Sequence, residues 1–361
     1  MAHETKTLRE LPSRLLAWYR RAKRDLPWRR TRDPYRIWLA ETMLQQTRVV
    51  AVVPYYERFL ARFPTLAALA AAPVDEVLKL WAGLGYYARA RNFHAAAREV
   101  VARHGGRVPR RLDELLALPG VGRYTAGAIR SIGFNLPAPI LDGNVARILA
   151  RLFAIRQDVK AAAAQKRLWA LAEALLPQGH ARDFNQAMME LGAVVCVPRS
   201  PACDRCPVAD LCEARRLGLQ QRLPRKPKRK AVPHYDVGLG VVWRRGRVLI
   251  ARRHDVALLG GLWEFPGGKR QADEPLAETV RREVEEEAGI AVAVGEHLMT
   301  YGHAYSHFRV TLHVFACRSD RGRPRPLGCA ACRWVKVDEL GDYAFPSGSR
   351  RIIEALREGA R

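Results

Sequence analysis

The chain has 361 residues, 48% of them hydrophobic, which is enough to bury a full core and to form two domains. Its 61 Lys and Arg residues against 36 Asp and Glu give a net charge of +25, which indicates a polyanionic partner such as nucleic acid. No apolar run reaches the roughly eighteen residues of a membrane span, and the first nine residues lack the apolar core of a signal peptide. We therefore expect a soluble, cytoplasmic monomer.

Residues 11 to about 217 have a helical pattern throughout. Ala-rich and Leu-rich amphipathic stretches alternate with stops such as Phe63-Pro64, Ala72-Pro73 and Leu176-Pro177. This pattern predicts about nine or ten helices in an all-α domain over residues 1–220.

The segment DPYRIWLAETMLQQTRV, residues 33–49, predicts a helix with Asp33 as N-cap and Pro34 at the first helical position. Glu41 falls on the same face as Ile37, which should turn toward the core. Burial would raise the pKa of this carboxyl group and make it a general acid at neutral pH. The alternative is a glutamate at the rim of that face, paired with an arginine.

Residues 111–129 predict an amphipathic helix, a Leu-Pro-Gly-Val-Gly turn and a second helix opened by small residues, which is a helix-hairpin-helix. Gly120 and Gly122 would let the backbone approach a phosphate, and the amides at the start of the second helix would bind that anion without reading sequence. Taken alone, the same turn could be an ordinary connection between helices.

A second carboxylate, Asp142, stands in PILDGNVARIL at the entry to a predicted helix, where backbone amides can keep it ionised. It could equally be a plain N-cap. Cleavage of a glycosidic bond needs two such groups, an acid that protonates the leaving base and an anion that faces the developing positive sugar. Glu41 and Asp142 are our candidates for this pair.

Four of the seven cysteines follow the spacing C-x6-C-x2-C-x5-C, tight enough for four thiolates to hold one metal centre. Zinc also accepts four thiolates and is the alternative. The spacing resembles that of the endonuclease III and MutY superfamily, which implies a 4Fe-4S cluster with a structural and DNA-positioning role. The proposed ligands are Cys196, Cys203, Cys206 and Cys212, whereas Cys317, Cys329 and Cys332 are expected to be free thiols.

Residues 221–234, QRLPRKPKRKAVPH, combine prolines with like charges and predict a basic linker near DNA. After the linker the hydrophobic period becomes alternating, as in VGLGVVW, RVLIARR and FRVTLHVFAC. This change predicts a second, α+β domain over residues 235–361, with strands around one or two helices.

Residues 268–290 of this second domain fit every fixed position of the Nudix box, G-x5-E-x7-R-E-U-x-E-E-x-G-U, where U is apolar. Glu283, Glu286 and Glu287 fall on one helix face, where they repel one another unless a cation such as Mg²⁺ offsets the charge. With magnesium held there and Glu274 in support, the domain would hydrolyse an oxidised nucleotide such as 8-oxo-dGTP. The alternative is a Nudix fold retained only to read a lesion, since PSGS at 346–349 lacks the asparagine of the MutT-type hydrolases.

Over residues 12–212 the motifs together resemble the MutY family of adenine DNA glycosylases, of the helix-hairpin-helix superfamily. Glu41 in ETMLQQT and Asp142 in LDGNV stand where that family keeps its catalytic acid and its oxocarbenium-stabilising aspartate, while Tyr124 and Asn144 match residues that orient the pair. The resemblance implies a nucleoid-associated enzyme that binds double-stranded DNA and excises adenine opposite 8-oxoguanine or guanine.

The resemblance also implies further contacts. The adenine pocket would consist of Arg24, Leu26, Trp28, Arg29, Gln186 and Glu190, although Trp28 could equally belong to the core. Gln46 and Tyr86 match residues that fill the gap left by the flipped base and wedge beside its partner. Tyr305, Ser306 and His307 would recognise 8-oxoguanine, and Tyr305 departs from the phenylalanine usual in the family.

Two other functions compete with this interpretation. Related bifunctional lyases carry a lysine where this chain has Tyr124, and a phenol cannot form the Schiff base that strand cleavage needs. A lyase for oxidised pyrimidines is therefore disfavoured, and a monofunctional glycosylase is expected. A DNA-binding scaffold without chemistry would not need Glu41 and Asp142 in their motifs.

Overall fold

The computed structural model describes residues 2–225, 232–305 and 308–359. The chain divides into two compact units. The first, which we call the helical unit, comprises residues 1–71 and 95–229, and the second, the C-terminal unit, comprises residues 72–94 and 230–361.

Up to Arg216, the described residues form twelve α-helices, more than the nine or ten expected, because the Pro and Gly stops delimit several helices of only four to six residues. Helices end just before the predicted stops at Pro64, Pro73 and Pro177. The helices are α1 (Ala2–Ala22), α2 (Pro34–Leu44), α3 (Val49–Arg62), α4 (Leu66–Ala71), α5 (Val74–Trp81), α6 (Ala88–His104), α7 (Leu112–Ala117), α8 (Arg123–Ala128), α9 (Gly143–Leu152), α10 (Ala162–Ala174), α11 (Ala181–Val194) and α12 (Glu213–Arg216). None of the described helices is long and apolar enough to span a bilayer.

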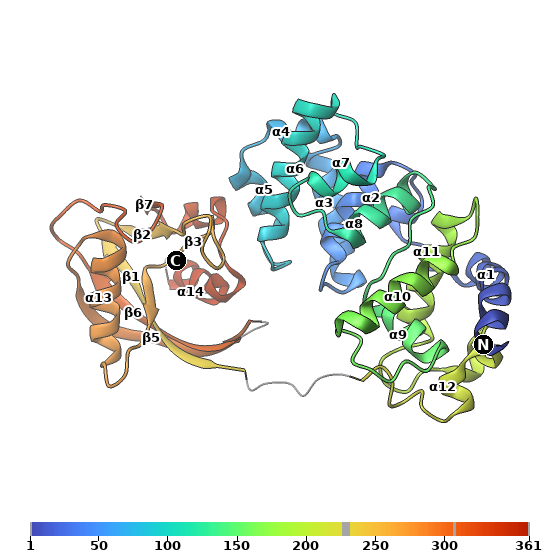
Figure 1. The fold of residues 1–361 in the computed structure, drawn as a ribbon. Coiled ribbons are helices and arrows are strands. Elements are labelled where there is room, and N and C mark those ends of the chain that lie inside the picture. The colour runs from blue at the N-terminus through green and yellow to red at the C-terminus, as the bar shows by residue number, and fades with distance from the viewer. Residues whose placement is uncertain (1, 226–231, 306–307, 360–361) are drawn as a thin grey trace. The chain divides into compact units, whose positions relative to one another are not determined.

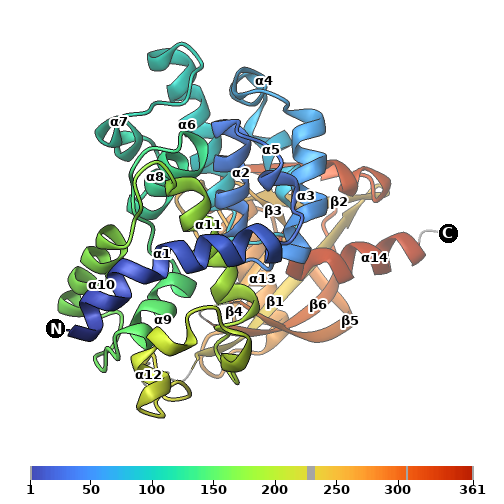
Figure 2. The ribbon, with the colours of Figure 1, turned by 90° about the vertical axis from the view of Figure 1, so that its right-hand side faces the viewer.

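The hydrophobic core that supports the site lies between α1, α9, α10 and α11. Leu15, Leu149, Leu168 and Leu191, one from each helix, are almost inaccessible to solvent. Figure 2 shows α1 running across α11, with α9 and α10 beside them. This packing fixes α9 and α11. The start of α9 carries Asp142 and Asn144, and α11 carries Gln186 and Glu190.

The helix predicted over residues 33–49 is shorter in the structure, so its predicted end was wrong. Asp33 caps α2 by accepting a 2.9 Å hydrogen bond from the amide of Tyr35, and Pro34 occupies the first position, as predicted. The chain leaves the helix after Leu44, because Gln46 has a left-handed backbone conformation with φ of 59° that an α-helix cannot accommodate.

The predicted linker also differs at both ends. Leu223 is buried and its carbonyl accepts a 2.9 Å hydrogen bond from Nε of Arg151, so the first part of the predicted linker belongs to the helical unit. His234 is already the first residue of strand β1, where it pairs with Arg309. Residues 226–231 lie outside the described residues.

The C-terminal unit contains a seven-stranded mixed sheet of order β3-β2-β1-β6-β5, with β4 paired to β1 and β7 to β2 (Figure 1). The β1–β6 pair is parallel, and every other pairing is antiparallel. The strands are β1 (His234–Arg244), β2 (Arg247–Arg252), β3 (Trp263–Glu264), β4 (Gly267–Lys269), β5 (Ala293–Ala304), β6 (Arg309–Arg318) and β7 (Ala331–Val335). They include the three segments predicted to be strands, so the α+β prediction is confirmed.

Two helices cover this sheet, α13 (Leu276–Ala288) on one face and α14 (Arg350–Gly359) on the other. Glycines in β1 explain the close approach of α13, because a Cβ atom at Gly238 would lie 2.9 Å from Cγ2 of Val280. The apolar side of α13, with Val280, Val284 and Ala288, is thereby buried.

Candidate active site

A cavity of about 1300 Å³ in the helical unit brings together the predicted catalytic and adenine-binding residues. Its walls come from α2, α8, α9, α11 and the loops beside them. Among its lining residues are Arg24, Leu26, Trp28, Arg29, Glu41, Gln46, Tyr124, Asp142, Asn144, Gln186 and Glu190.

Glu41 is the buried carboxyl group of this cavity, with 4% of its surface exposed. The hydroxyl of Tyr124 donates a 2.5 Å hydrogen bond to its Oε2. Burial raises the pKa of Glu41 to about 7, with the negative charge of Asp142 acting in the same direction and the Tyr124 hydrogen bond against it. The predicted burial is confirmed, and the group can carry a proton near neutral pH.

Asp142 is the N-cap of α9 and faces the same cavity. Its Oδ1 accepts a 2.7 Å hydrogen bond from the amide of Val145, and its Oδ2 accepts a 2.9 Å bond from Nδ2 of Asn144. Burial raises the pKa of Asp142 above its ordinary value, while these hydrogen bonds and Arg147 oppose the rise. The hydrogen bond from a backbone amide that we predicted is therefore present. Burial nevertheless has the larger effect on the pKa of Asp142.

Arg147 supports this constellation and was not singled out from the sequence. Its Nη2 donates to Oδ1 of Asn144 at 2.8 Å and to the carbonyl of Gly192 at 2.7 Å, and its Nε donates to the carbonyl of Cys196 at 2.7 Å. The only sequence signal was a pair of arginines, Arg147 and Arg151, four residues apart in a helix that is otherwise apolar after Asn144.

The four cysteines between Cys196 and Cys212 line one small cavity of about 30 Å³. Nη1 of Arg151, a residue only 2% exposed, lies 3.2 Å from Sγ of Cys196. Burial raises the pKa of Cys206 to about 12, so binding of iron here must displace thiol protons. Four cysteines that line one cavity, with a guanidinium group beside them, fit a multi-iron cluster better than a single metal ion.

Glu190 has a more specific place in the adenine pocket than the sequence predicted. Its two oxygens accept hydrogen bonds from Nε and Nη2 of Arg24 at 2.8 and 2.7 Å, and from Nη2 of Arg29 at 2.7 Å. Burial would raise its pKa, but the two arginines outweigh this effect and lower the pKa to about 2. Glu190 thus fixes two pocket arginines, and its oxygens are already engaged.

The remaining pocket residues are largely buried. Trp28, 7% exposed, packs edge-to-face on Tyr56 with 5.4 Å between the ring centroids, so it lines the cavity and belongs to the core at once. Gln186 is also buried. Sequence reasoning missed Met189, whose Sδ lies 3.5 Å from the Tyr124 hydroxyl and completes the wall beside Glu41.

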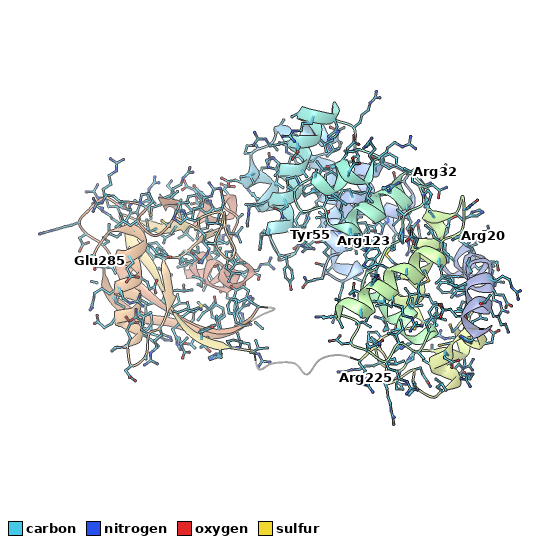
Figure 3. All side chains as sticks on the ribbon, viewed as in Figure 1. Arg20, Arg32, Tyr55, Arg123, Arg225 and Glu285 are labelled. Atoms are coloured by element: carbon cyan, nitrogen blue, oxygen red, sulfur yellow. The ribbon has the colours of Figure 1, made fainter. Side chains whose placement is uncertain are left out.

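The predicted DNA-contacting residues occupy unusual backbone positions. Gln46 and Tyr86 have φ values of 59° and 50°, a left-handed conformation that is rare outside glycine and concentrates at functional sites. The predicted hairpin forms between α7 and α8, with Gly120 at φ of 73° and Gly122 as N-cap of α8. In Figure 3 the exposed side chains of Arg20, Arg32 and Arg123 extend from three different parts of the helical unit.

In the C-terminal unit, the Nudix-box carboxylates are engaged with one arginine and with the backbone. Arg282 donates to Glu274, Glu283 and Glu286 at 2.8, 2.9 and 3.1 Å, and Glu287 accepts a 3.3 Å bond from the amide of Gly267. Among the residues that the structure describes, no three His, Cys, Asp or Glu side chains converge on a single metal ion.

Glu264 on β3 is a further, partly buried acid that the sequence did not reveal. Nη1 of Arg253 donates to both of its oxygens at 2.7 Å. Burial, together with the charge of Glu264, raises the pKa of Glu287 to about 8. Two carboxyl groups from β3 and α13 therefore share a partly desolvated region.

Of the three residues predicted to recognise 8-oxoguanine, the structure describes only Tyr305. Its ring stands against those of His303 and Phe308, with centroid distances of 4.6 and 4.8 Å. Its amide donates a 2.9 Å hydrogen bond to the carbonyl of Phe308. Ser306 and His307 lie outside the described residues.

Comparison with known families agrees with this arrangement. Residues 39–174 match the HhH-GPD superfamily of base excision DNA repair proteins, and residues 196–212 match the iron-sulfur binding domain of endonuclease III. Residues 238–355 match the NUDIX domain. The fold and the site thus define a helix-hairpin-helix DNA glycosylase that holds a 4Fe-4S cluster and carries a Nudix-type domain.

Among its relatives, the human adenine DNA glycosylase is 36% identical, over 95% of this chain and 73% of that protein. The adenine DNA glycosylase of Buchnera aphidicola subsp. Baizongia pistaciae is 37% identical, over 72% of this chain and 74% of its own length. A thermostable thymine-DNA glycosylase is structurally similar, with a TM-score of 0.55 and 34% identity over 59% of this chain and 98% of that one. The chain belongs to the adenine DNA glycosylase family, and it acts on DNA in base excision repair.

Proposed function

We propose that the enzyme excises adenine opposite 8-oxoguanine or guanine, with Glu41 as general acid and Asp142 as the anion that faces the sugar. The observation that carries this proposal is that both carboxyl groups line one cavity and differ in environment. Glu41 has a pKa of about 7 and can donate a proton to a ring nitrogen of the leaving base. Asp142, held by two hydrogen bonds, offers negative charge to the oxocarbenium ion.

Tyr124 positions the acid in this mechanism. Its hydroxyl holds Oε2 of Glu41, which leaves the other oxygen of Glu41 to carry the proton. After the base departs, ionised Glu41 can accept a proton from the incoming water. Because Tyr124 carries a phenol and no amine, we propose that the reaction stops at an abasic site.

Recognition of the mismatch is shared in this proposal between both parts of the chain. Gln46 and Tyr86 would enter the duplex beside the flipped base, which agrees with their strained backbone conformations. Tyr305, Ser306 and His307 would contact 8-oxoguanine. We assign residues 1–220 to the glycosylase domain and residues 235–361 to the Nudix domain, in a monomer that acts on nucleoid DNA.

The test uses duplexes that contain adenine opposite 8-oxoguanine, adenine opposite guanine, or thymine glycol. We expect alkali-labile sites in the first two, and no direct nick. Glu41→Gln should lower the single-turnover rate about 10²–10⁴-fold, with mismatch affinity nearly unchanged, because it removes the proton donor at constant shape. Glu285→Gln, on an exposed position of α13, is the matched control.

Three outcomes would contradict this proposal. A wild-type excision rate for Glu41→Gln would show that a group other than Glu41 donates the proton. Direct nicking of thymine glycol duplexes would indicate a lyase, and binding without any excision would indicate a scaffold.

A second candidate function follows from the crowding of Glu264 and Glu287. Two partly desolvated carboxylates next to a Nudix box favour a bound cation, which would lower the pKa of Glu287 from about 8. Glu283 and Glu287 would hold Mg²⁺, with Glu286 and Glu274 in support. When bound, the ion would polarise a phosphoanhydride of an oxidised nucleoside triphosphate for attack by water.

The full-length protein with Mg²⁺ should release pyrophosphate from 8-oxo-dGTP, and Glu287→Gln should abolish this release while Glu285→Gln retains it. If neither 8-oxo-dGTP nor the ordinary nucleoside triphosphates are cleaved above the background of Glu287→Gln, the domain only reads the lesion.

A further inference from the structure

Cys329 and Cys332 form a close pair of thiols in the C-terminal unit. Their sulfur atoms lie 3.3 Å apart, in contact, although the residues are separated by only Ala330 and Ala331. Cys332 is fixed in β7 opposite Ala251, whereas Cys329 precedes the strand in a bend. A disulfide needs the sulfurs at about 2.05 Å, so closure requires a movement of little more than 1 Å within this bend.

We propose that this pair is a redox-modification site, which closes to an intramolecular disulfide when a hydroperoxide oxidises it. Cys332 is half-exposed and Cys329 is buried, so the peroxide reaches Cys332 first. Its sulfur attacks the O–O bond and becomes a sulfenic acid, and the peroxide is reduced to water or an alcohol. The sulfur of Cys329 then displaces the hydroxyl group, which leaves as a second molecule of water.

The hydrogen bonds of Cys329 connect this site to the end of α13. Its Sγ–H donates to the carbonyl of Glu287 at 3.3 Å, and the amides of Leu327 and Gly328 donate to the same oxygen at 3.0 and 3.3 Å. Oxidation removes the thiol proton and with it one of these three bonds. The segment 327–329 is therefore the part of the Nudix-type domain whose hydrogen bonding should change on oxidation.

Cys317 is a suitable internal reference, because it is a buried thiol of the same unit and, within the described part of the chain, its sulfur contacts no second cysteine. The chain also offers convenient peptides. Trypsin does not cleave Arg-Pro bonds, so residues 322–333 stay in one peptide that contains both Cys329 and Cys332, while Cys317 lies in residues 310–318.

The test treats the full-length, cluster-containing protein with graded hydrogen peroxide, in the presence of a metal chelator that captures any released iron. Unreacted thiols are then alkylated under denaturing conditions, and the masses of the tryptic peptides are measured by mass spectrometry. We expect peptide 322–333 to lose both alkylation sites, to become lighter by two hydrogen atoms, and to recover with dithiothreitol. Half-oxidation should need about tenfold less peroxide than Cys317 does.

Variants distinguish the roles of the two sulfur atoms. The disulfide itself can be detected in the wild-type protein alone. Cys329→Ser should leave a sulfenic acid at Cys332 that dimedone traps, and Cys317→Ser should leave disulfide formation unchanged. The proposal is wrong if peptide 322–333 and Cys317 lose their thiols in parallel. It is equally wrong if Cys332 accumulates as sulfinic acid with Cys329 still alkylatable.

Discussion

The hydroxyl of Tyr124 and the carboxylate of Glu41 lie 2.5 Å apart, with the phenol as donor. Burial raises the pKa of Glu41 to about 7, and this hydrogen bond keeps the pKa from rising further because it stabilises the ionised form. Burial and the two nearby carboxylates raise the pKa of Tyr124 well above its ordinary value, so the phenol remains a donor over the working range of pH.

This relationship predicts a pH profile. The single-turnover rate should rise as Asp142 ionises and fall above pH about 7 as Glu41 loses its proton. Tyr124→Phe removes a bond that favours the carboxylate, so the pKa of Glu41 should increase and the alkaline limb should move to higher pH. Measurement of excision between pH 5 and 10 tests this, and an alkaline limb that stays in place would show that Glu41 is not the titrating group.

The parts of this site that the sequence predicted are the local ones. Periodicity placed Glu41 on a buried helix face, and the residues after Asp142 identified it as a helix N-cap. Arg147 and Glu264 could not be found in this way, because their partners Cys196 and Glu287 lie far along the chain and only the tertiary fold brings them together. The end of α2 was missed because the conformation of Gln46 has no signature in its residue type.

Glu190 should make stability depend on pH. Its pKa of about 2 is below the ordinary value of 4.5, so its ionised form stabilises the fold fully above pH 4.5, and this contribution disappears as the pH falls toward 2. Glu190→Gln should cost about 1–3 kcal/mol at pH 7, since it leaves Arg24 and Arg29 without their anion. The exposed Glu173→Gln is the control. Identical urea unfolding of all three proteins at pH 7 would contradict this role.

Arg151 should determine how firmly the cluster is held. Its guanidinium donates to the carbonyls of Val197 and Pro198 at 2.9 and 3.2 Å as well as to Cys196. Arg151→Met keeps the apolar bulk but leaves these carbonyls unpaired, so a chelator should remove iron faster, which is visible as a loss of absorbance. Arg199→Met, at an exposed position, provides the comparison. Equal rates of iron loss would limit Arg151 to a packing role.

Gly192 on α11 should be intolerant of a methyl group because of Asn144. A Cβ atom at this position would lie 2.5 Å from Cβ of Asn144, and Asn144 in turn donates to Asp142. Alanine normally stabilises a helix by about 1 kcal/mol relative to glycine. The added methyl group here meets Cβ and Cα of Asn144, so α9 or α11 must shift, and overpacking of this kind costs about 1–3 kcal/mol. We expect that Asn144 is displaced and that the excision rate falls about 10²-fold, with a lower melting temperature that does not by itself account for the loss of activity at 25 °C. Gly302→Ala, where no atom lies within 4 Å of the added methyl group, is the control. Full activity of Gly192→Ala would mean that Asp142 keeps its orientation without Asn144.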